Sequence, residues 1–307
     1  MPTSEFAASA EITQLLEQIK TGIVNANAKL KTGIIEFSIT LSQATRAEGE
    51  DQYQHEETGR WHILYRFDGE HHFYDVKVHN KMELNGKPLD DWQNNRFQYQ
   101  MDMDKKTLLF QEYTGTGWKR HPVQSIPSRD FRLYYTLHWW IWPHWEPKHS
   151  KLTELLHLDN VADVKEDRVA DTSNYQITLK RTVSGLKLTS EISLDVQKDY
   201  RPTRVFVHIH NEGTIPLQPE GPPGSAIPSQ TLKEYRVTSW TYQLKKFKPD
   251  VWYPSRITRE NSFVTEIEDE KQQPKMPPIL RKATLQVHRA VFNIPIAKED
   301  LYIRGDE

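Results

Sequence analysis

Histidine is the residue type in this sequence whose number and spacing first suggest chemistry. The chain has 13 histidines, and imidazole side chains bind transition metals and exchange protons near neutral pH. His208 and His210 are the best-spaced pair, because the alternation of a β-strand would place both rings on one face. Two ligands do not complete a zinc site, and no carboxylate follows at the spacing of a zinc-protease helix. We therefore expect solvated outer-face histidines here, with a zinc site as the weak alternative.

Motifs of the common enzyme classes are missing from the sequence. It contains no Gly-x-Ser-x-Gly nucleophile elbow, no phosphate-binding glycine loop and no dinucleotide-binding fingerprint. Its acidic residues are scattered, so no carboxylate pair suited to sugar hydrolysis can be singled out. Cysteine is absent, which excludes disulfides, thiolate metal sites, a cysteine nucleophile and lipid attachment through cysteine. These observations favour a protein that is not an enzyme and needs no cofactor.

Residues 134–149, YYTLHWWIWPHWEPKH, are the most aromatic part of the chain. They include four tryptophans, two tyrosines and three histidines. Asp130 and Pro143 bracket about three turns that a helix could fill, and a second short helix is expected from Ser150 to Leu158. The first helix would be apolar almost all round, so it should be buried on two sides or line a cavity. Two interpretations stay open: the rings are core, or the segment near 128–158 is a lid over an apolar cavity.

The overall composition excludes other classes of protein. Forty basic and forty-two acidic residues give a formal charge of −2, so no summed positive field attracts nucleic acid or an anionic membrane. An aromatic content of 11% argues against a disordered chain. No apolar run approaches the roughly twenty residues of a membrane span, and the first residues lack the pattern of a secretion signal. We expect a folded protein without nucleic-acid partners or transmembrane segments.

The hydrophobic pattern divides the chain into one long helix followed by a series of strands. From Ser9 to Leu30, apolar residues recur every three or four positions, as in a one-faced helix. After Thr32, β-branched and aromatic runs alternate with polar residues and end in Gly, Asn or Asp. Short polar turns join these runs, so neighbouring strands should pair antiparallel. The pattern predicts an α+β, mainly β fold: one large curved antiparallel sheet of about eleven strands with a concave face.

Three longer connections interrupt the strand pattern. They run from Gln43 to Gly59, over residues 212–230 and over residues 268–279, and the last two are rich in proline. They are either insertions at the ends of hairpins or a flap and partner-contact arms at the mouth of the curved sheet.

Four features of the chain occur together: the amphipathic first helix, "RWHILYRFDGE" after the first long strand, "VWYPSRITRE" late in the chain, and the terminal "FNIPIAKEDLYI". In this combination the sequence resembles the LolA/LolB-like family of bacterial outer-membrane lipoprotein carriers and related envelope proteins. Asn293-Ile294-Pro295 is similar to the Asn-x-Pro motif that commonly ends the final strand in that family. The resemblance covers most of the chain in element order.

The resemblance implies a fold, a ligand class and a location. It implies a single domain over residues 1–307, in which a helix leads into a half-open barrel and central helices cover its concave face. It also implies a lipid or acylated lipoprotein as ligand, a possible envelope protein as partner, and the periplasm or cell envelope as location. The chain departs from the family in its greater length, its lack of an export signal and its lack of the cysteine that anchors the membrane-bound acceptor. A cytoplasmic location therefore stays open, and an acceptor role is disfavoured.

The physical argument for an apolar ligand is simple. Each CH₂ group of an acyl chain that leaves water for an apolar cavity gains about 0.8 kcal/mol. We predict a cavity and lid lined by Ile35, Phe37, Ile39, Leu64, Phe67, Tyr135, Trp139, Trp142, Trp240 and Trp252. A protein-interaction platform formed by the concave sheet and the proline-rich loops is the alternative, and a hydrolase is a lesser one.

Overall fold

The structure is a computed structural model of the chain. It describes residues 4–45, 54–69, 71–84, 87–102, 104–105, 107–125, 152–169, 172–183, 186–216, 229–267 and 281–303. None of the helices in these ranges combines the length and apolar character needed to cross a membrane.

A single long helix precedes the sheet, as predicted. Helix α1 (Ser4–Ala28) begins earlier than the expected Ser9 and ends close to the expected Leu30. Leu16, Ile19 and Ile23 are its most deeply buried apolar residues, and their spacing of three and four places them on one stripe. Gly22 lies beside that stripe at a close approach, because an added Cβ would come within 2.3 Å of the Tyr200 ring. Helix α1 therefore packs tightly along the stripe that Gly22 borders.

The strands form one antiparallel sheet, which the sequence also predicted. They are β1 (Thr32–Thr45), β2 (Gln54–Asp68), β3 (His71–Leu84), β4 (Lys87–Asp102), β5 (Thr107–Tyr113), β6 (Trp118–Arg120), β7 (Gln124–Ser125), β8 (Val161–Val169), β9 (Thr172–Val183), β10 (Leu186–Asp195), β11 (Arg201–Pro216), β12 (Ser229–Phe247), β13 (Val251–Ile267) and β14 (Arg281–Phe292). The sheet thus has fourteen strands, and the expected number of about eleven was too low.

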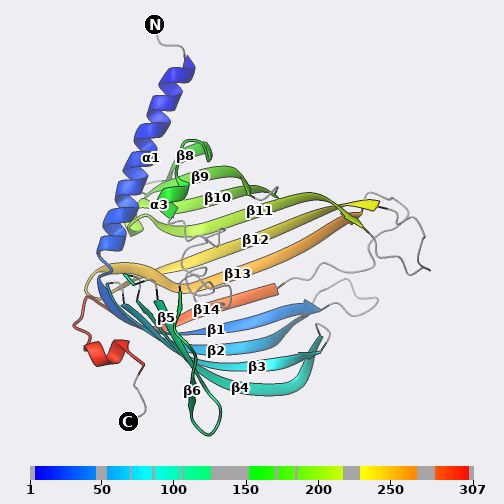
Figure 1. Ribbon diagram of the computed structural model, residues 1–307. Coiled ribbons are helices and arrows are strands. Elements are labelled where there is room, and N and C mark those ends of the chain that lie inside the picture. Colours follow the sequence, from blue (N-terminus) through cyan, green and yellow to red (C-terminus); the bar gives the residue numbers. More distant parts are fainter. Residues whose placement is uncertain are drawn as a thin grey trace.

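Two meanders meet in the middle of the sheet. The strand order is β6-β5-β4-β3-β2-β1-β14-β13-β12-β11-β10-β9-β8, with β7 paired to β5 off this path. Consecutive strands pair antiparallel from β1 to β6 and from β8 to β14, whereas β1 and β14 join the two halves of the chain through pairs such as Ile39 with Leu285. Figure 1 shows that the joined sheet curls rather than lying flat. The sheet is open, with β6 and β8 at its two edges.

The two faces of the sheet carry different segments. Helices α1 and α3 (Leu152–Leu155) share one large apolar cluster with residues from β1 to β5 and from β9 to β14; we call this face the inner face. The opposite, outer face carries a small second cluster, in which Leu301 and Ile303 of the C-terminal segment contact Phe73 of β3. Leu301 belongs to the short 3-10 helix η2 (Lys298–Leu301). The core therefore lies between the inner face and the two helices.

Parts of the expected loops and central helices differ from the structure. Residues 212–216 and 229–230 were expected in a proline-rich loop but extend β11 and β12, where Glu212 pairs with Lys233. The strands β1 and β2 likewise extend into the expected loop from Gln43 to Gly59. The expected helix from Ser150 to Leu158 is reduced to the single turn of α3. The aromatic segment at 126–151, the proline-rich residues 217–228 and residues 268–280 lie outside the described residues.

Candidate functional site

The inner face is the candidate binding surface, because apolar side chains follow it from strand to strand. In β1, Ile35, Phe37 and Ile39 are all at most 3% exposed, and strand alternation places them on one face. The same alternation buries the inner residues of β9 and β10. A face this wide and this apolar is suited to bury hydrocarbon.

Aromatic rings form a stacked row on the inner face of β2 and β3. Tyr65 lies directly opposite Tyr74 in the strand register, and their ring centroids are 4.4 Å apart with an interplanar angle of 5°. Phe67 stacks on Tyr65 at 5.1 Å. The hydroxyl of Tyr65 lies 2.7 Å from Nδ1 of His72, and burial, with a smaller effect of His71, lowers the pKa of His72 to about 4. His72 is therefore neutral near pH 7, and in the tautomer protonated at Nε2 its Nδ1 can accept a hydrogen bond from the Tyr65 hydroxyl.

The row continues toward the β6 edge of the sheet on β4 and β5, because Tyr99 of β4 lies opposite Tyr74 in the strand register. Tyr99 and Phe110 are opposite one another with ring centroids 4.9 Å apart, and His121 stacks on Phe110 at 4.7 Å. Phe97, Tyr99 and Phe110 are only half-buried. They are the rings of the row that remain partly accessible to a ligand.

A polar group interrupts the apolar inner face on β12 and β13. Trp240 lies opposite Arg259, whose guanidinium carbon is 5.5 Å from the centroid of the Trp240 ring. Tyr242 lies two residues further along β12, and burial raises the pKa of its hydroxyl while the charge of Arg259 lowers it to a smaller extent. The hydroxyl of Tyr242 and Oδ1 of Asn261 are buried and have no hydrogen-bond partner within the described ranges. Such groups are costly unless something satisfies them.

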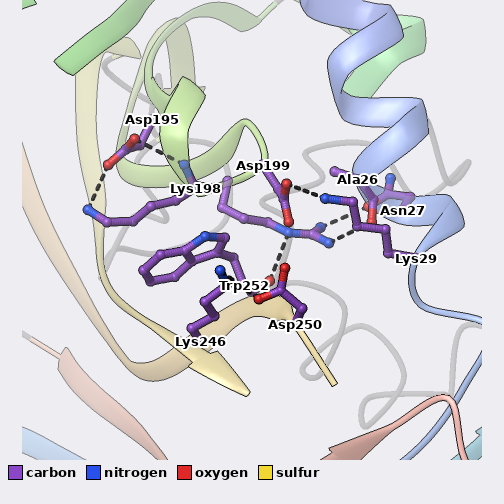
Figure 2. A network of polar contacts seen from close by, with 10 residues as sticks. Ala26, Asn27, Lys29, Asp195, Lys198, Asp199, Lys246, Asp250 and Trp252 are labelled. Atoms are coloured by element: carbon purple, nitrogen blue, oxygen red, sulfur yellow. Dashed lines mark hydrogen bonds and ion pairs between the residues drawn. The ribbon is translucent and has the colours of Figure 1, made fainter. Parts of the chain in front are cut away.

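Arg201 fixes helix α1 against this face through hydrogen bonds to the end of α1, where Figure 2 labels Ala26 and Asn27. The side chain is 2% exposed and donates to Ala26 O at 3.0 Å, to Asn27 Oδ1 at 2.9 Å and to Trp252 O at 3.1 Å. Burial lowers the pKa of Arg201, with Tyr253 and Asp199 acting in the opposite direction. Nearby, Lys29 forms an ion pair with Asp199 at 2.5 Å. These contacts join the C-terminal end of α1 to β11 and β13.

Two cavities lie away from the centre of the inner face. One of about 840 Å³ is at the end of the sheet beside the C-terminus of α1, lined by residues that include Lys29, Val251 and Ile294. The other, of about 380 Å³, is on the outer face, where Arg96 forms two hydrogen bonds with Asp75. Both are bounded by charged side chains, so neither has the character of an enclosed apolar pocket.

Five of the predicted lining residues lie together on the inner face. Ile35, Phe37, Ile39, Phe67 and Trp240 are each at most 7% exposed and belong to the same apolar cluster. The structure thus brings these side chains together, within the core that faces α1 and α3.

Two predicted lining residues are on the wrong face. Leu64 lies between the inner residues Ile63 and Tyr65, so alternation turns it outward, away from Phe67. Trp252 likewise lies between the buried Val251 and Tyr253. Its ring is flanked instead by the ammonium groups of Lys198 and Lys246, at 5.9 and 6.0 Å from the centroid. Neither residue can line an inner cavity.

The remaining predicted site residues are three aromatic residues of the lid and the two candidate metal ligands. Tyr135, Trp139 and Trp142 lie outside the described residues. His208 alternates with Val207 and Ile209 on β11 and so belongs to the outer face, where its ring is 6.4 Å from that of Phe206. For His210 the structure describes the backbone, which lies opposite Lys187 of β10. In the ranges that the structure covers, no group of three or more His, Asp or Glu side chains could hold a metal ion.

The aromatic row and the polar group were missed by reasoning from the sequence. A signal for the row was present, because Tyr65 and Phe67 are two residues apart, as are Phe97 and Tyr99. Arg259 and Tyr242 gave no local signal, because their proximity depends on the register of β12 with β13.

Comparison of the chain with protein-family models and with curated proteins found no match.

Proposed function

We propose that this protein binds an apolar ligand on the inner face of its sheet and carries it without chemical change. The ligand class is the acyl chain of a lipid or of an acylated lipoprotein. The observation that carries the proposal is the aromatic row that runs from the buried Tyr65 and Tyr74 to the half-buried Phe110. A row of this kind offers an apolar track that begins where a ligand can enter.

The energetics favour an acyl chain over a small polar ligand. Burial of each CH₂ group gains about 0.8 kcal/mol, so a long chain can offset the entropic cost of association. Flat rings add a large contact area with few rotatable bonds. Because the described inner face has few groups suited to catalysis, affinity for hydrocarbon is the property that this surface supports best.

The similarity to LolA/LolB-like carriers supports a location for this activity. We propose the periplasm or the cell envelope, where acylated proteins and lipids need carriage through water. The protein-interaction platform and the hydrolase stay as sequence predictions that no particular contact in the structure favours.

Two phenylalanines provide a matched test of the proposal. Phe110 of β5 is half-buried on the inner face, and Phe206 of β11 is half-buried on the outer face. We expect Phe110→Asp to weaken binding of a pyrene-labelled hexadecanoic acid at least about ten-fold, because it removes apolar contact and adds a charge. Phe206→Asp should change the affinity by less than about two-fold, since it leaves the inner face intact.

The measurement is fluorescence titration of both variants, with Phe110→Leu as a conservative control that should retain binding. Circular dichroism and a thermal melt establish that each variant is folded. Equal affinities for Phe110→Asp and Phe206→Asp, with both folded, would show that the ligand does not bind along the aromatic row.

A further inference from the structure

Arg259 and Tyr242 form a polar group on β12 and β13, whereas the inner face around them is apolar. Arg259 has Trp240 opposite it on β12 and Ala283 opposite it on β14. Tyr242 has the fully buried Ile257 opposite it. The strand register thus places three apolar residues directly opposite Arg259 and Tyr242, and an electrostatic contact is stronger in apolar surroundings than in water.

Tyr242 contributes the observation that points to a ligand. It is 5% exposed, and its buried hydroxyl has no partner within the described part of the chain. Burial keeps this hydroxyl protonated by raising its pKa, so it is available as a hydrogen-bond donor. Arg259 lies diagonally across the strand pair on the same face, and arginine stays charged in proteins and prefers carboxylate and phosphate oxygens.

We propose that the ligand is an anionic amphiphile whose acid headgroup is held by Arg259 and Tyr242 while its hydrocarbon lies on the inner face. This inference rests on the proposed function and narrows its ligand class. The headgroup chemistry is that of a carboxylate or a phosphate, either of which can accept from both donors. The Trp240 ring, over which the guanidinium lies at 5.5 Å, keeps Arg259 oriented toward the same face.

Three ligands with the same chain length distinguish the contribution of the headgroup to affinity from that of the hydrocarbon. They are palmitate, hexadecyl phosphate and the neutral hexadecanol, each measured by displacement of a neutral fluorescent hydrocarbon probe from the full chain. We expect palmitate or hexadecyl phosphate, or both, to bind at least about ten-fold more tightly than hexadecanol, because charge-assisted hydrogen bonds are added. The preferred anion then distinguishes a fatty-acid source from a phosphate source.

Two variants test the assigned residues. Arg259→Gln should reduce the preference for the anion to less than about two-fold while hexadecanol binding is retained, and Arg259→Lys should restore part of it. Tyr242→Phe, which also removes an unsatisfied buried hydroxyl and so should not destabilise the fold, should lower the preference about three-fold.

The outcomes separate this inference from the proposed function. Equal binding of all three ligands by the unaltered protein overturns the headgroup site but leaves acyl binding in place. A preference for the anion that survives in both Arg259→Gln and Tyr242→Phe also overturns it, because other groups would then hold the acid. Failure of all three ligands to displace the probe overturns both proposals.

Discussion

His72 shows how the inner face constrains a single residue. It lies in the aromatic row and shares a hydrogen bond with the Tyr65 hydroxyl at 2.7 Å, and its pKa falls from 6.5 to about 4 because burial disfavours the charged ring. The unfolded chain therefore binds a proton that the folded chain does not, in the window between these two pH values. The contribution of His72 to the free energy of unfolding therefore has its full value above pH 6.5, and it decreases as the pH falls toward 4.

The resulting prediction concerns the pH dependence of stability. In urea unfolding, the free energy of unfolding of the unaltered protein should fall by up to about 3 kcal/mol between pH 7 and pH 4 because of His72. The His72→Gln variant should not show this contribution. The control is His62→Gln, which changes an exposed histidine of the same strand pair and should leave the loss in place. Identical pH profiles for His72→Gln and the unaltered protein would contradict the assignment of a buried, neutral His72.

Residue positions could be predicted from the sequence only where the strand pattern is unambiguous. Ile35, Phe37 and Ile39 alternate with polar residues, so one face could be chosen for all three. In "WHILYRFD" and "VWYP", apolar or aromatic residues are adjacent, and either alternation fits the pattern. The choice of Leu64 and Trp252 as lining residues was wrong for this reason, since only packing against α1 and α3 decides which face is inner.

At the scale of elements, the attachment of α1 depends on one buried side chain. Arg201 of β11 donates to Ala26 and Asn27 at the end of α1 and to Trp252 of β13. The bond to Ala26 O satisfies a backbone carbonyl in the last turn of the helix, and the bonds to Asn27 Oδ1 and Trp252 O tie that end of the helix to β13. The helix contributes Leu16, Ile19 and Ile23 to the core, so loosening its end should loosen the core.

We predict that Arg201→Met lowers the free energy of unfolding by about 3 kcal/mol, because buried acceptors lose their donor. Arg204→Met serves as the control, since Arg204 is an exposed arginine on the same strand, and it should change stability by less than about 0.5 kcal/mol. Urea unfolding measures both values, and hydrogen exchange in the last turn of α1 should accelerate only in Arg201→Met. Equal stability of the two variants would mean that α1 is held by its apolar stripe alone.

The element pattern was predictable where local preference and tertiary structure agree. The helix from Ser9 to Leu30 was found as α1, because its period of 3.6 has a single interpretation. Strand β4 gives only a weak strand signal, because "KPLDDWQNNRFQYQMD" is rich in Asp, Asn and Gln, which are poor strand formers. Pairing with β3 and β5 determines its structure. Strand β8, "VADVKEDRV", gives a weak signal for a related reason: it is a charged edge strand, and charges discourage further pairing there.

At the scale of the whole molecule, the mainly β class and the single antiparallel sheet follow from the sequence of turns and alternating runs. The junction of β1 with β14 could not be predicted in the same way, because it pairs residues near the two ends of the chain. That junction makes one face continuous from β5 to β9. The inner face depends on it, since its apolar cluster includes residues from both meanders, which β1 and β14 join in the middle of the sheet (Figure 1).

Native mass spectrometry of the unaltered protein, purified without detergent and then mixed with palmitate, tests acyl binding by this face most directly. We predict a complex of one chain with acyl lipid, carried through purification or formed on addition, which is lost in Phe110→Asp and kept in Phe206→Asp. A spectrum that shows only the free chain, both as purified and after addition of palmitate, would contradict the account.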